Sequence, residues 1–360
     1  MLGPKRESLM KIKEINDYQD FLALKDEWAN LLEKCQLSVF STWEWLSTWW
    51  KNFGGDKRLV LLLAIDNDRI IGIAPLMYSA RKIFGLRRGK ISFIGIPHTD
   101  YHDFIIANKI EKCLQLFIDY LKQLPEKWNY LELSEIPENS KSIPILTKLS
   151  KTLKPFTRCP YKPLPESRDA FWNSLGSDMR RNLRRYIKKT KKEFHVEFAD
   201  YSDSQLCTEG MHWLFELHQK RWRSKGLSGA FADEKVRNFH LEVAKIFARR
   251  MQLRLFLLKL SNKPVAAIYG FKDKKRFYLY LSGFDPEYSQ YRVGNQIIAY
   301  TMEKCIEEGL SEFDFMRGGE TYKGFWKTLS RWNYTAIITR DIFSTASHWL
   351  YTKILSKLNL

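Results

Sequence analysis

The stretch RFYLYLSGFDPEYSQYRVGNQIIAYTMEKCIEEGLSEFDFM, Arg276–Met316, decides the fold. Its first residues, Arg276–Ser282, alternate around aromatic side chains, which predicts a strand. Asn295–Glu308 then has apolar residues four apart along one stripe, as an amphipathic helix does, and Gly309 is a natural residue to end that helix. Ser311–Met316 resumes the alternation of a strand. A strand, a loop, a helix and another strand in this order place the start of the helix at the edge of a sheet.

A predicted hairpin precedes this stretch, and a similar hairpin lies in the first half of the chain. Leu253–Leu260 and Pro264–Phe271 are apolar strands around a polar turn, and so are Leu59–Ile65 and Arg69–Leu76. The two hairpins superimpose without a gap at an offset of 195 residues, and each follows helical segments that contain tryptophan. Because hairpins are common, coincidence is the alternative, but the shared order favours an internal duplication.

The length of 360 residues fits two domains, each with its own core. Lys154–Arg168 carries four of the 12 prolines and is the best candidate for a linker. We therefore expect an α+β protein with one domain over residues 1–160, a second over 165–345, and an amphipathic C-terminal helix over 346–360. That last helix docks on the protein or lies on a membrane surface.

The composition excludes several classes of protein. With 44% hydrophobic and 28% charged residues, the chain is neither disordered, collagen-like nor a coiled coil, and its apolar runs are too short to span a bilayer. The start of the sequence lacks a secretory signal, and the five cysteines are scattered, so we expect no disulfide scaffold and no zinc finger but a cytoplasmic protein. Two tryptophans at i, i+4, Trp45 and Trp49, are expected in a helix that faces the core rather than a sugar.

The charge is strongly positive, with 59 Lys and Arg against 41 Asp and Glu, a net charge of +18. Residues 1–160 account for 24 basic and 19 acidic residues, so most of the excess lies in the second half. Arg180–Lys192 holds eight cations without one acid, on a predicted helix whose buried seam is Leu183 and Ile187. This helix is either a solvated face or a contact for phosphates, an anionic glycan or an anionic membrane.

The loop before the helix Asn295–Glu308 can bind an anion. Free backbone N–H groups and the dipole at a helix start attract negative charge, and Gly294 permits a close approach, so a pyrophosphate fits here. An ordinary helix start looks the same in sequence. The residues of this candidate site are Tyr291, Arg292, Val293, Gly294, Asn295 and Gln296.

Phe313–Trp326, FDFMRGGETYKGFW, is chemically dense. Acyl transfer needs a base for the proton of the acceptor, positive charge for the oxyanion and an acid for the leaving group. The candidates are Glu320 or Asp314 as base, Tyr322 as acid, and Lys323 or Arg317 as positive charge. The alternative is a structural ion pair between Asp314 and Arg317 with a solvated Lys323. In the catalytic interpretation, Lys323→Ala and Glu320→Gln abolish turnover and leave the fold intact.

Two histidine-containing segments complete the candidates. His218, four residues before Trp222 on a predicted helix, is either a base or simply a hydrogen-bonded histidine. In Gly95–Phe104, the side chains of His98, Asp100 and His102 share one face if the chain is extended, but a fourth metal ligand is not evident, and we expect no metal.

The second half of the sequence resembles the GNAT acyltransferases. It is most similar to the CelD/BcsL branch, which is associated with cellulose and exopolysaccharide biosynthesis and is built from two GNAT-like domains. The stretches that carry the resemblance are Arg180–Lys189, Leu217–Trp222, Tyr280–Ile298 and Phe313–Trp326. The resemblance implies two tandem GNAT-like domains, each with a mixed, mostly antiparallel twisted sheet flanked by helices.

The resemblance also implies a mechanism and partners. Acetyl-CoA or another acyl-CoA binds the second domain at Arg292–Gln296, and a sugar, polysaccharide precursor or other cell-envelope acceptor attacks the thioester directly. The first domain has no counterpart of that loop and binds no cofactor. The acceptor contacts implied or suggested are Asp100, Tyr101, Asp103, Arg181, Arg185, Trp222 and Trp326.

A second family has the same build. The stretch Tyr322–Phe325 also resembles the Lys-containing segment of the Fem-type peptidyltransferases, which use aminoacyl-tRNA and have two GNAT-like domains. In that interpretation, Lys323 and Arg180–Lys192 hold the acceptor end of tRNA. A third possibility is a non-catalytic module of the same fold that binds glycan or an anionic membrane.

Overall fold

The computed structural model describes residues 10–83 and 86–340, and these form two compact units. The first unit comprises the residues up to Thr157 together with those from Trp332 onward, and the second comprises Arg158–Arg331. The expected boundary near residue 160 lies close to this division, whereas the second unit ends earlier than the expected residue 345. The predicted helix 346–360 lies outside the described residues.

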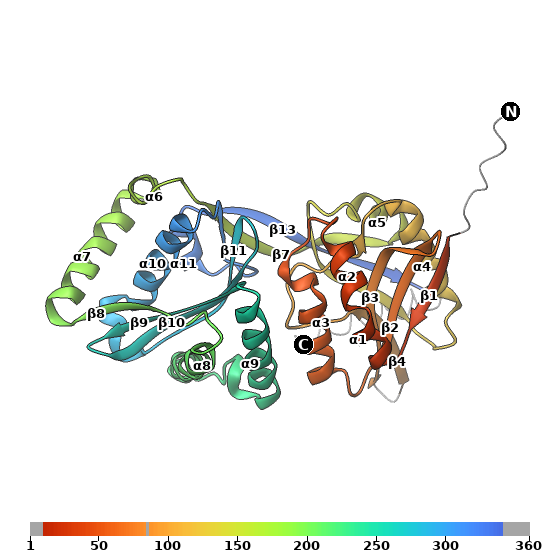
Figure 1. Cartoon of the computed structure of the whole chain (residues 1–360), viewed down its shortest axis with the longest axis horizontal. Coiled ribbons are helices and arrows are strands. Elements are labelled where there is room, and N and C mark those ends of the chain that lie inside the picture. Colours follow the sequence, from red (N-terminus) through yellow and green to blue (C-terminus); the bar gives the residue numbers. More distant parts are fainter. Residues whose placement is uncertain (1–9, 84–85, 341–360) are drawn as a thin grey trace. The chain divides into compact units, whose positions relative to one another are not determined.

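The first unit is a mixed sheet with helices (Figure 1). Its strands lie in the order β1-β2-β3-β4-β6-β13, with β5 paired to β3, and only the pair β4–β6 is parallel. Its elements are β1 (Lys11–Ile15), α1 (Tyr18–Ala23), α2 (Lys25–Leu32), α3 (Trp43–Phe53), β2 (Arg58–Asp66), β3 (Arg69–Ile83), β4 (Leu86–Phe93), β5 (Ile105–Ile106), α4 (Ile110–Gln123), β6 (Tyr130–Pro137), α5 (Ile143–Leu149) and β13 (Leu329–Thr339).

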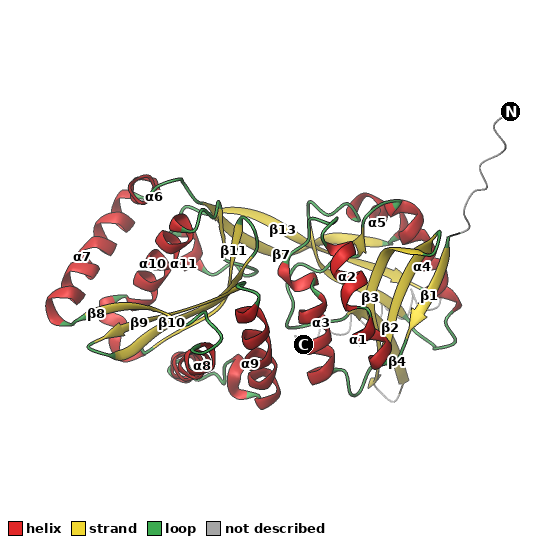
Figure 2. Cartoon of the chain, viewed as in Figure 1, coloured by secondary structure: helices red, strands yellow, loops and turns green. Residues whose placement is uncertain are grey.

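The second unit has strands in the order β7-β12-β11-β10-β9-β8, of which only β11–β12 is parallel. Helices α7 and α10 lie on one face of this sheet, and α8 and α9 lie on the other (Figure 2). Its elements are β7 (Thr152–Pro163), α6 (Arg168–Ser174), α7 (Ser177–Glu193), β8 (Val196–Asp200), α8 (Cys207–Arg223), α9 (Glu234–Arg249), β9 (Leu253–Leu260), β10 (Lys263–Lys272), β11 (Arg276–Phe284), the 3₁₀ helix Pro286–Tyr291, α10 (Val293–Glu307), β12 (Glu312–Asp314) and α11 (Thr321–Gly324).

The two units repeat one topology, which is consistent with the expected duplication. In each, a first strand and a helical layer precede a three-stranded meander, then come a helix and a strand parallel to the end of the meander. The final strand is exchanged: β7 follows β6 in the chain but pairs with β12, and β13 follows β12 but pairs with β6. The predicted fold class, α+β with two tandem GNAT-like sheets, is therefore confirmed.

The equivalence of the two hairpins differs by one residue from the expected offset of 195. The turn residues with positive φ are Asn67 and Asp68 in one hairpin and Ser261 and Asn262 in the other, an offset of 194. At that offset the bulge also coincides, because the pairing skips Ile71 in β3 and Val265 in β10. A slip of one residue would exchange the two faces of a strand, so 194 is the structural offset.

The proline-rich stretch Lys154–Arg168 is not a flexible linker, because most of it is strand β7. A proline removes a backbone donor but keeps its carbonyl, and the carbonyl of Pro160 accepts the N–H of Phe315 at 2.9 Å. Prolines are therefore tolerated where the strand only needs to accept. The predicted core position of Trp45 and Trp49 is confirmed, since both are at most 1% exposed.

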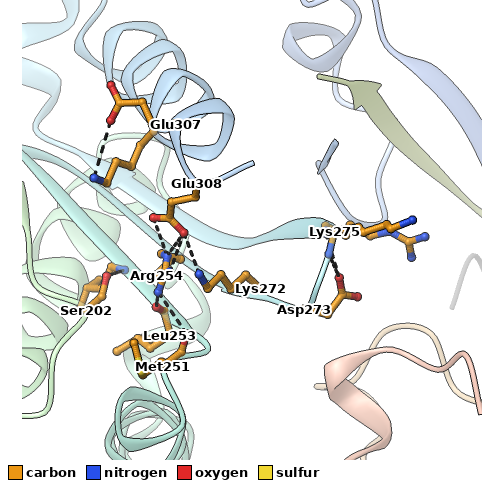
Figure 3. A network of polar contacts seen from close by, with 12 residues as sticks. Ser202, Met251, Leu253, Arg254, Lys272, Asp273, Lys275, Glu307 and Glu308 are labelled. Atoms are coloured by element: carbon orange, nitrogen blue, oxygen red, sulfur yellow. Dashed lines mark hydrogen bonds and ion pairs between the residues drawn. The ribbon is translucent and has the colours of Figure 1, made fainter. Parts of the chain in front are cut away.

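Helix α10 is fixed to the sheet along its side and at its end. Ile298, Met302 and Ile306 are buried as the sequence predicts. At the C-terminal end, Glu308 binds Arg254 of β9 at 2.6 Å and Lys272 of β10 at 2.9 Å (Figure 3). These cations offset the repulsion between the carboxylate and the negative end of the helix dipole. The N-terminus of α10 is thereby held at the opposite end of the helix.

Candidate active site

The parallel strands β11 and β12 pair over only three residues and then part. The last pair is Tyr278 with Asp314, after which β11 continues along β10 to Phe284. The pairing with β10 passes over Tyr280, so β11 has a bulge just where it leaves β12. The chain after Asp314 instead bonds to β7, through Phe315 N–H to Pro160. Among the described residues, no strand therefore pairs with the β12-facing edge of β11 beyond Tyr278.

Helix α10 begins where β11 ends. Arg292 precedes it in the left-handed conformation, with φ of 54°, and no side chain caps the helix. The N–H groups of Asn295 and Gln296 turn back to the carbonyl of Arg292. Within the described part of the chain, Val293 and Gly294 have no recorded acceptor for their N–H groups. Two adjacent backbone donors are thus available at the positive end of a helix dipole.

Cationic side chains from two other helices converge on this point. Arg221 of α8 lies 5.0 Å from the ring centre of Phe284, and the virtual Cβ of Gly294 lies 3.5 Å from the same ring. The buried Nε–H of Arg221 has no acceptor among the described residues, and an unsatisfied buried donor of this kind is costly. Hydrogen bonds from Arg292 and Arg185 lower the pKa of the Tyr186 phenol. An anion at this point can satisfy all of these groups.

The basic helix α7 packs beside the start of α10. Gln296 donates to Thr190 at 2.8 Å and to the carbonyl of Tyr291 at 2.7 Å, and the Tyr291 hydroxyl binds Glu193. Lys189 lies over the Tyr291 ring at 4.8 Å. Of the predicted seam, Leu183 is buried and Ile187 is partly buried against the core, while the cations of the helix remain mostly exposed. Thus α7 both supports the anion-binding loop and adds positive charge beside it.

Asp314 is a structural residue, not a base. It is fully buried, and its carboxylate accepts the N–H of Met316 at 2.8 Å and an N–H of Arg331 at 2.5 Å. Arg331 is thus one partner of Asp314, and the ion pair with Arg317 that the sequence suggests stays a prediction. A carboxylate held between a cation and a backbone donor has no free lone pair aimed at an acceptor. Asp314 joins β12 to β13.

Lys323 is buried rather than solvated, and its ammonium is fully engaged. It donates to the carbonyl oxygens of Met316, Arg317 and Gly318 at 2.8–3.4 Å and pairs with Glu320 at 2.8 Å. Lys323→Ala would remove the cation that binds these carbonyls, so we expect it to disturb the loop as well as turnover. Lys323 is a positioning residue for the loop 316–320.

Glu320 and Tyr322 remain the candidates for base and acid. Glu320 is exposed, and the Tyr322 side chain is half-buried against Phe315. Burial and then the nearby Glu320 carboxylate raise the pKa of Tyr322 to about 12, while the charge of Arg221 opposes this. The phenol therefore keeps its proton at neutral pH and can donate it. Arg317 is half-buried on the same loop.

His218 does not fit the role of a base. Its Nε2 accepts the indole N–H of Trp222 at 2.9 Å, and burial lowers its pKa to about 4. It sits tightly below β11, because a Cβ on Gly283 would lie 2.4 Å from the His218 backbone nitrogen. Trp222 is half-buried by this contact. Trp326, expected at the acceptor, is fully buried in the core.

The expected acceptor residues of the first unit are buried. The Asp103 carboxylate accepts the Ser142 hydroxyl at 2.7 Å and the Phe104 N–H at 2.8 Å, and burial raises its pKa. Asp100 and Tyr101 are each 5% exposed. Asp103 is thus a structural group. The prediction that it contacts the acceptor does not agree with its burial. Arg181 and Arg185 are exposed on α7, where Arg181 pairs with Asp178.

The first unit does have a backbone counterpart of the anion-binding loop, contrary to expectation. Lys109 precedes α4 with φ of 50°, and no side chain caps that helix. The positive charge of Lys109 is neutralised nearby, because Lys109 pairs with Asp66 at 2.6 Å. Glu111 also places a negative charge in the first turn of α4. The topology is shared, but the positive charge is not.

Sequence reasoning missed Arg221, Tyr186 and Phe284. Arg221 lies inside the stretch that was singled out around His218, and it is the next residue on the same helix face toward β11. Spacing could have indicated Arg221, because it is three residues after His218 and therefore lies on the same face of the helix. Its convergence with Arg292 could not be read from the sequence, since 70 residues separate them.

Residues 177–324 match the family described as an acetyltransferase (GNAT) domain. Most of the second unit is therefore similar to a GNAT acetyltransferase domain. The prediction of a GNAT-type acyltransferase is thereby confirmed, and the chain is a transferase. This match does not distinguish the CelD/BcsL branch from other GNAT proteins.

Solved structures share the fold of the whole chain. The crystal structure of FemX is 12% identical, with a TM-score of 0.63, and the match covers 91% of this chain and 97% of FemX. The structure of L-PGS from Bacillus licheniformis is 14% identical, with a TM-score of 0.58, and the match covers 96% and 99%. At these identities the likeness concerns the fold of the GNAT domain and its tandem partner. A search of curated proteins finds no significant match.

Neither a metal site nor a membrane span is found where the chain is described. The residues 10–83 and 86–340 contain no group of three or more His, Cys, Asp or Glu side chains arranged to hold a metal ion. The same residues include no helix that is long and apolar enough to cross a bilayer.

Proposed function

We propose that the protein transfers an acyl group from acyl-CoA, such as acetyl-CoA, to an amine or hydroxyl of its acceptor. One observation carries the proposal: Arg221, whose buried Nε–H has no acceptor among the described residues, and Gly294, at the uncapped start of α10, both lie against the ring of Phe284. Donors converging on the start of a helix suit a pyrophosphate. The arrangement lies where β11 parts from β12.

The residues present fit such a donor. Arg292 and Arg221 supply charge on either side of the start of α10, and the exposed cations of α7 extend it. The unpaired edge of β11 beyond Tyr278 offers backbone groups to an extended, amide-containing arm. The thioester, when bound, supplies an activated acyl group. The side chains of this unit would bind the donor and transfer the protons.

The proton transfers fall to two residues of one short segment. We assign Glu320 as the base that takes the proton of the acceptor and Tyr322 as the acid that returns one to the leaving sulfur. Glu320 is exposed, so an acceptor reaches it from solvent, and the raised pKa of Tyr322 keeps the phenol protonated. Lys323 holds Glu320 from the buried side. Tyr322→Phe is expected to lower kcat by about 10²-fold with little change in KM.

The acceptor we propose is a sugar, a polysaccharide precursor or another cell-envelope compound. The support is the resemblance of Arg180–Lys189 and Phe313–Trp326 to the CelD/BcsL branch. The exposed cations of α7, Arg181 and Arg185 among them, suit an anionic glycan or the anionic surface of the inner membrane.

A second candidate function has its own support. The exposed cations of α7 outnumber what one pyrophosphate needs, and they suit a tRNA acceptor end in a Fem-type peptidyltransferase. The name of one structural neighbour, FemX, points the same way, although the likeness is in fold.

One pair of titrations separates the donors. The full chain is titrated by calorimetry with acetyl-CoA and, in parallel, with aminoacyl-tRNA between 50 and about 200 mM salt. We expect saturable binding of acetyl-CoA and no saturable tRNA complex. A tRNA complex whose affinity falls steeply with salt, together with no response to acetyl-CoA, would replace the first function by the second. No binding of either contradicts both.

A further inference from the structure

Lys162 of β7 is a buried lysine without an anionic partner. It lies opposite Phe313 of β12 in the sheet register and is 4% exposed. Within the described part of the chain it has neither a recorded hydrogen bond nor an ion pair. Burial, and then the charge of Lys327, lower its pKa. No carboxylate contributes to that balance, which is unusual because buried charges in proteins are generally paired.

The other members of the cluster are Lys327 and the start of α7. Lys327 follows the buried Trp326, is exposed, and has a left-handed backbone with φ of 53°. Its Cε lies 3.6 Å from the position of a Cβ on Gly176, the residue that precedes α7. No side chain caps this helix of 17 residues. Its first-turn carboxylate, Asp178, is turned to Arg181 at 2.7 Å.

We propose that Lys162, Lys327 and the first turn of α7 form a binding site for a phosphate dianion or a phosphate monoester. A dianion compensates both ammonium groups, and its oxygens accept the uncapped N–H groups of the helix. A carboxylate compensates only one of the two cations. The buried Lys162 fixes the inner side of the site, and the exposed Lys327 leaves the outer side open to solvent.

This site is separate from the donor site at α10. The far end of α7, at Lys189 and Glu193, contacts Tyr291 beside the start of α10. Since α7 rises about 1.5 Å per residue, its two ends are roughly 25 Å apart. The proposal does not depend on the identity of the acyl donor. The phosphate comes either from solution or from a phosphorylated substrate that reaches along α7.

The test uses the full chain with the donor site removed by Arg221→Ala and Arg292→Ala. Inorganic phosphate is titrated into this parent by calorimetry, and we expect one saturable site. Lys162→Met and Lys327→Ala are each expected to weaken phosphate binding at least tenfold, whereas Lys274→Ala, at an exposed lysine before β11, leaves it unchanged. Unchanged phosphate affinity in both site variants, or no phosphate binding by the parent, overturns the proposal.

Two further measurements guard the interpretation. Lys162→Met replaces a buried charge by an apolar chain of similar length, so its melting temperature without phosphate is expected to equal or exceed that of the parent, and Lys327→Ala is at an exposed position. With the donor site intact, coenzyme A is compared with its 3′-dephospho form. If Lys327→Ala weakens only coenzyme A, the phosphate belongs to the donor, and if it weakens neither, the phosphate has a separate source. A failure of acetyl-CoA binding contradicts the proposed function and leaves the phosphate result standing.

Discussion

The starts of α4 and α10 are the same piece of backbone used in two ways. Each helix follows a basic residue in the left-handed conformation, Lys109 with φ of 50° and Arg292 with φ of 54°, and neither has a side-chain cap. Around α4 the charge is consumed by Asp66 and by Glu111 in the first turn, whereas α10 has no acid in its first turn and is joined by Arg221 and α7. A duplicated topology thus supplies two helix starts, and the surrounding side chains decide which one can bind an anion.

The largest expected effect concerns the third residue of the parallel pairing in each unit. Asp314 is buried with Arg331, while its counterpart Glu132 is 28% exposed beside Lys90 at 3.5 Å. Asp314→Asn is expected to lower the free energy of unfolding by about 3 kcal/mol, because Arg331 loses a buried partner. Glu132→Gln is expected to cost less than about 1 kcal/mol. Urea unfolding followed by circular dichroism measures both, and equal losses contradict the distinction.

The second effect concerns the two helix starts themselves. Arg221→Ala and Arg292→Ala are each expected to weaken acetyl-CoA binding about 10- to 100-fold, the range of a hydrogen bond to a charged group. Lys109→Ala, the matched control at the start of α4, is expected to change it less than twofold. Calorimetry on the three variants decides this. An equal loss in Lys109→Ala means that the first unit also binds the donor.

The third effect concerns the ends of the same helices. Glu308→Gln is expected to cost about 1.5–3 kcal/mol, since it removes the partner of Arg254 and Lys272. Arg340 donates to the carbonyls of Leu124 and Glu126 at the end of α4, and Arg340→Ala is expected to cost about 1 kcal/mol.

The Glu308 pair also predicts a pH dependence. Although burial opposes it, the hydrogen bonds from Arg254 and Lys272 lower the pKa of Glu308. A carboxyl whose folded pKa is lowered stabilises the fold above its unfolded pKa of about 4.3 and loses that contribution as the pH falls. The stability gap between the wild type and Glu308→Gln is therefore expected at pH 7 and should shrink below about pH 4. A gap that is constant with pH shows that the loss is steric.

The smallest expected effect concerns the two hairpin turns. Ser261 has φ of 47° and its counterpart Asn67 has φ of 49°. Asparagine tolerates this conformation better than serine, so Ser261→Gly is expected to stabilise by about 0.5–1 kcal/mol and Asn67→Gly by less. Thermal unfolding of both variants tests the offset of 194, because at an offset of 195 Asn67 corresponds to Asn262.

Much of the fold was accessible from local patterns. The strand, helix and strand of Arg276–Met316 and the apolar stripe of α10 were predicted because burial imposes a period of two or of about 3.6 residues on the chain. The offset was wrong by one residue because a bulge leaves no signature in hydrophobicity when both neighbours are apolar. The stretch Lys154–Arg168 does contain the division between the two units, but it was expected to be a poor strand and instead forms most of β7. The number of prolines in a sequence does not tell which backbone donors a strand requires.

The candidate site was less accessible. The loop Arg292–Gln296 was predicted from the order of glycine and helix, which is a local property. Asp314, Lys323 and His218 were assigned to chemistry because their side chains are chemically capable, yet Arg331, the carbonyls of residues 316–318 and Trp222 already occupy them. Whether a side chain is already engaged depends on partners that packing brings together. The composition of the sequence does not reveal those partners.

By itself, then, the sequence determined the two similar hairpins, the order of elements in Arg276–Met316 and the place of the excess charge, because these follow from periodicity and from counts along the chain. The tertiary structure decided which charges are free. Among the described residues, no ion pair is found for Arg221 or Arg292 near the start of α10, whereas Lys109 and Lys323 pair with carboxylates. The strength of a charge at a site depends on what lies within a few ångströms of it.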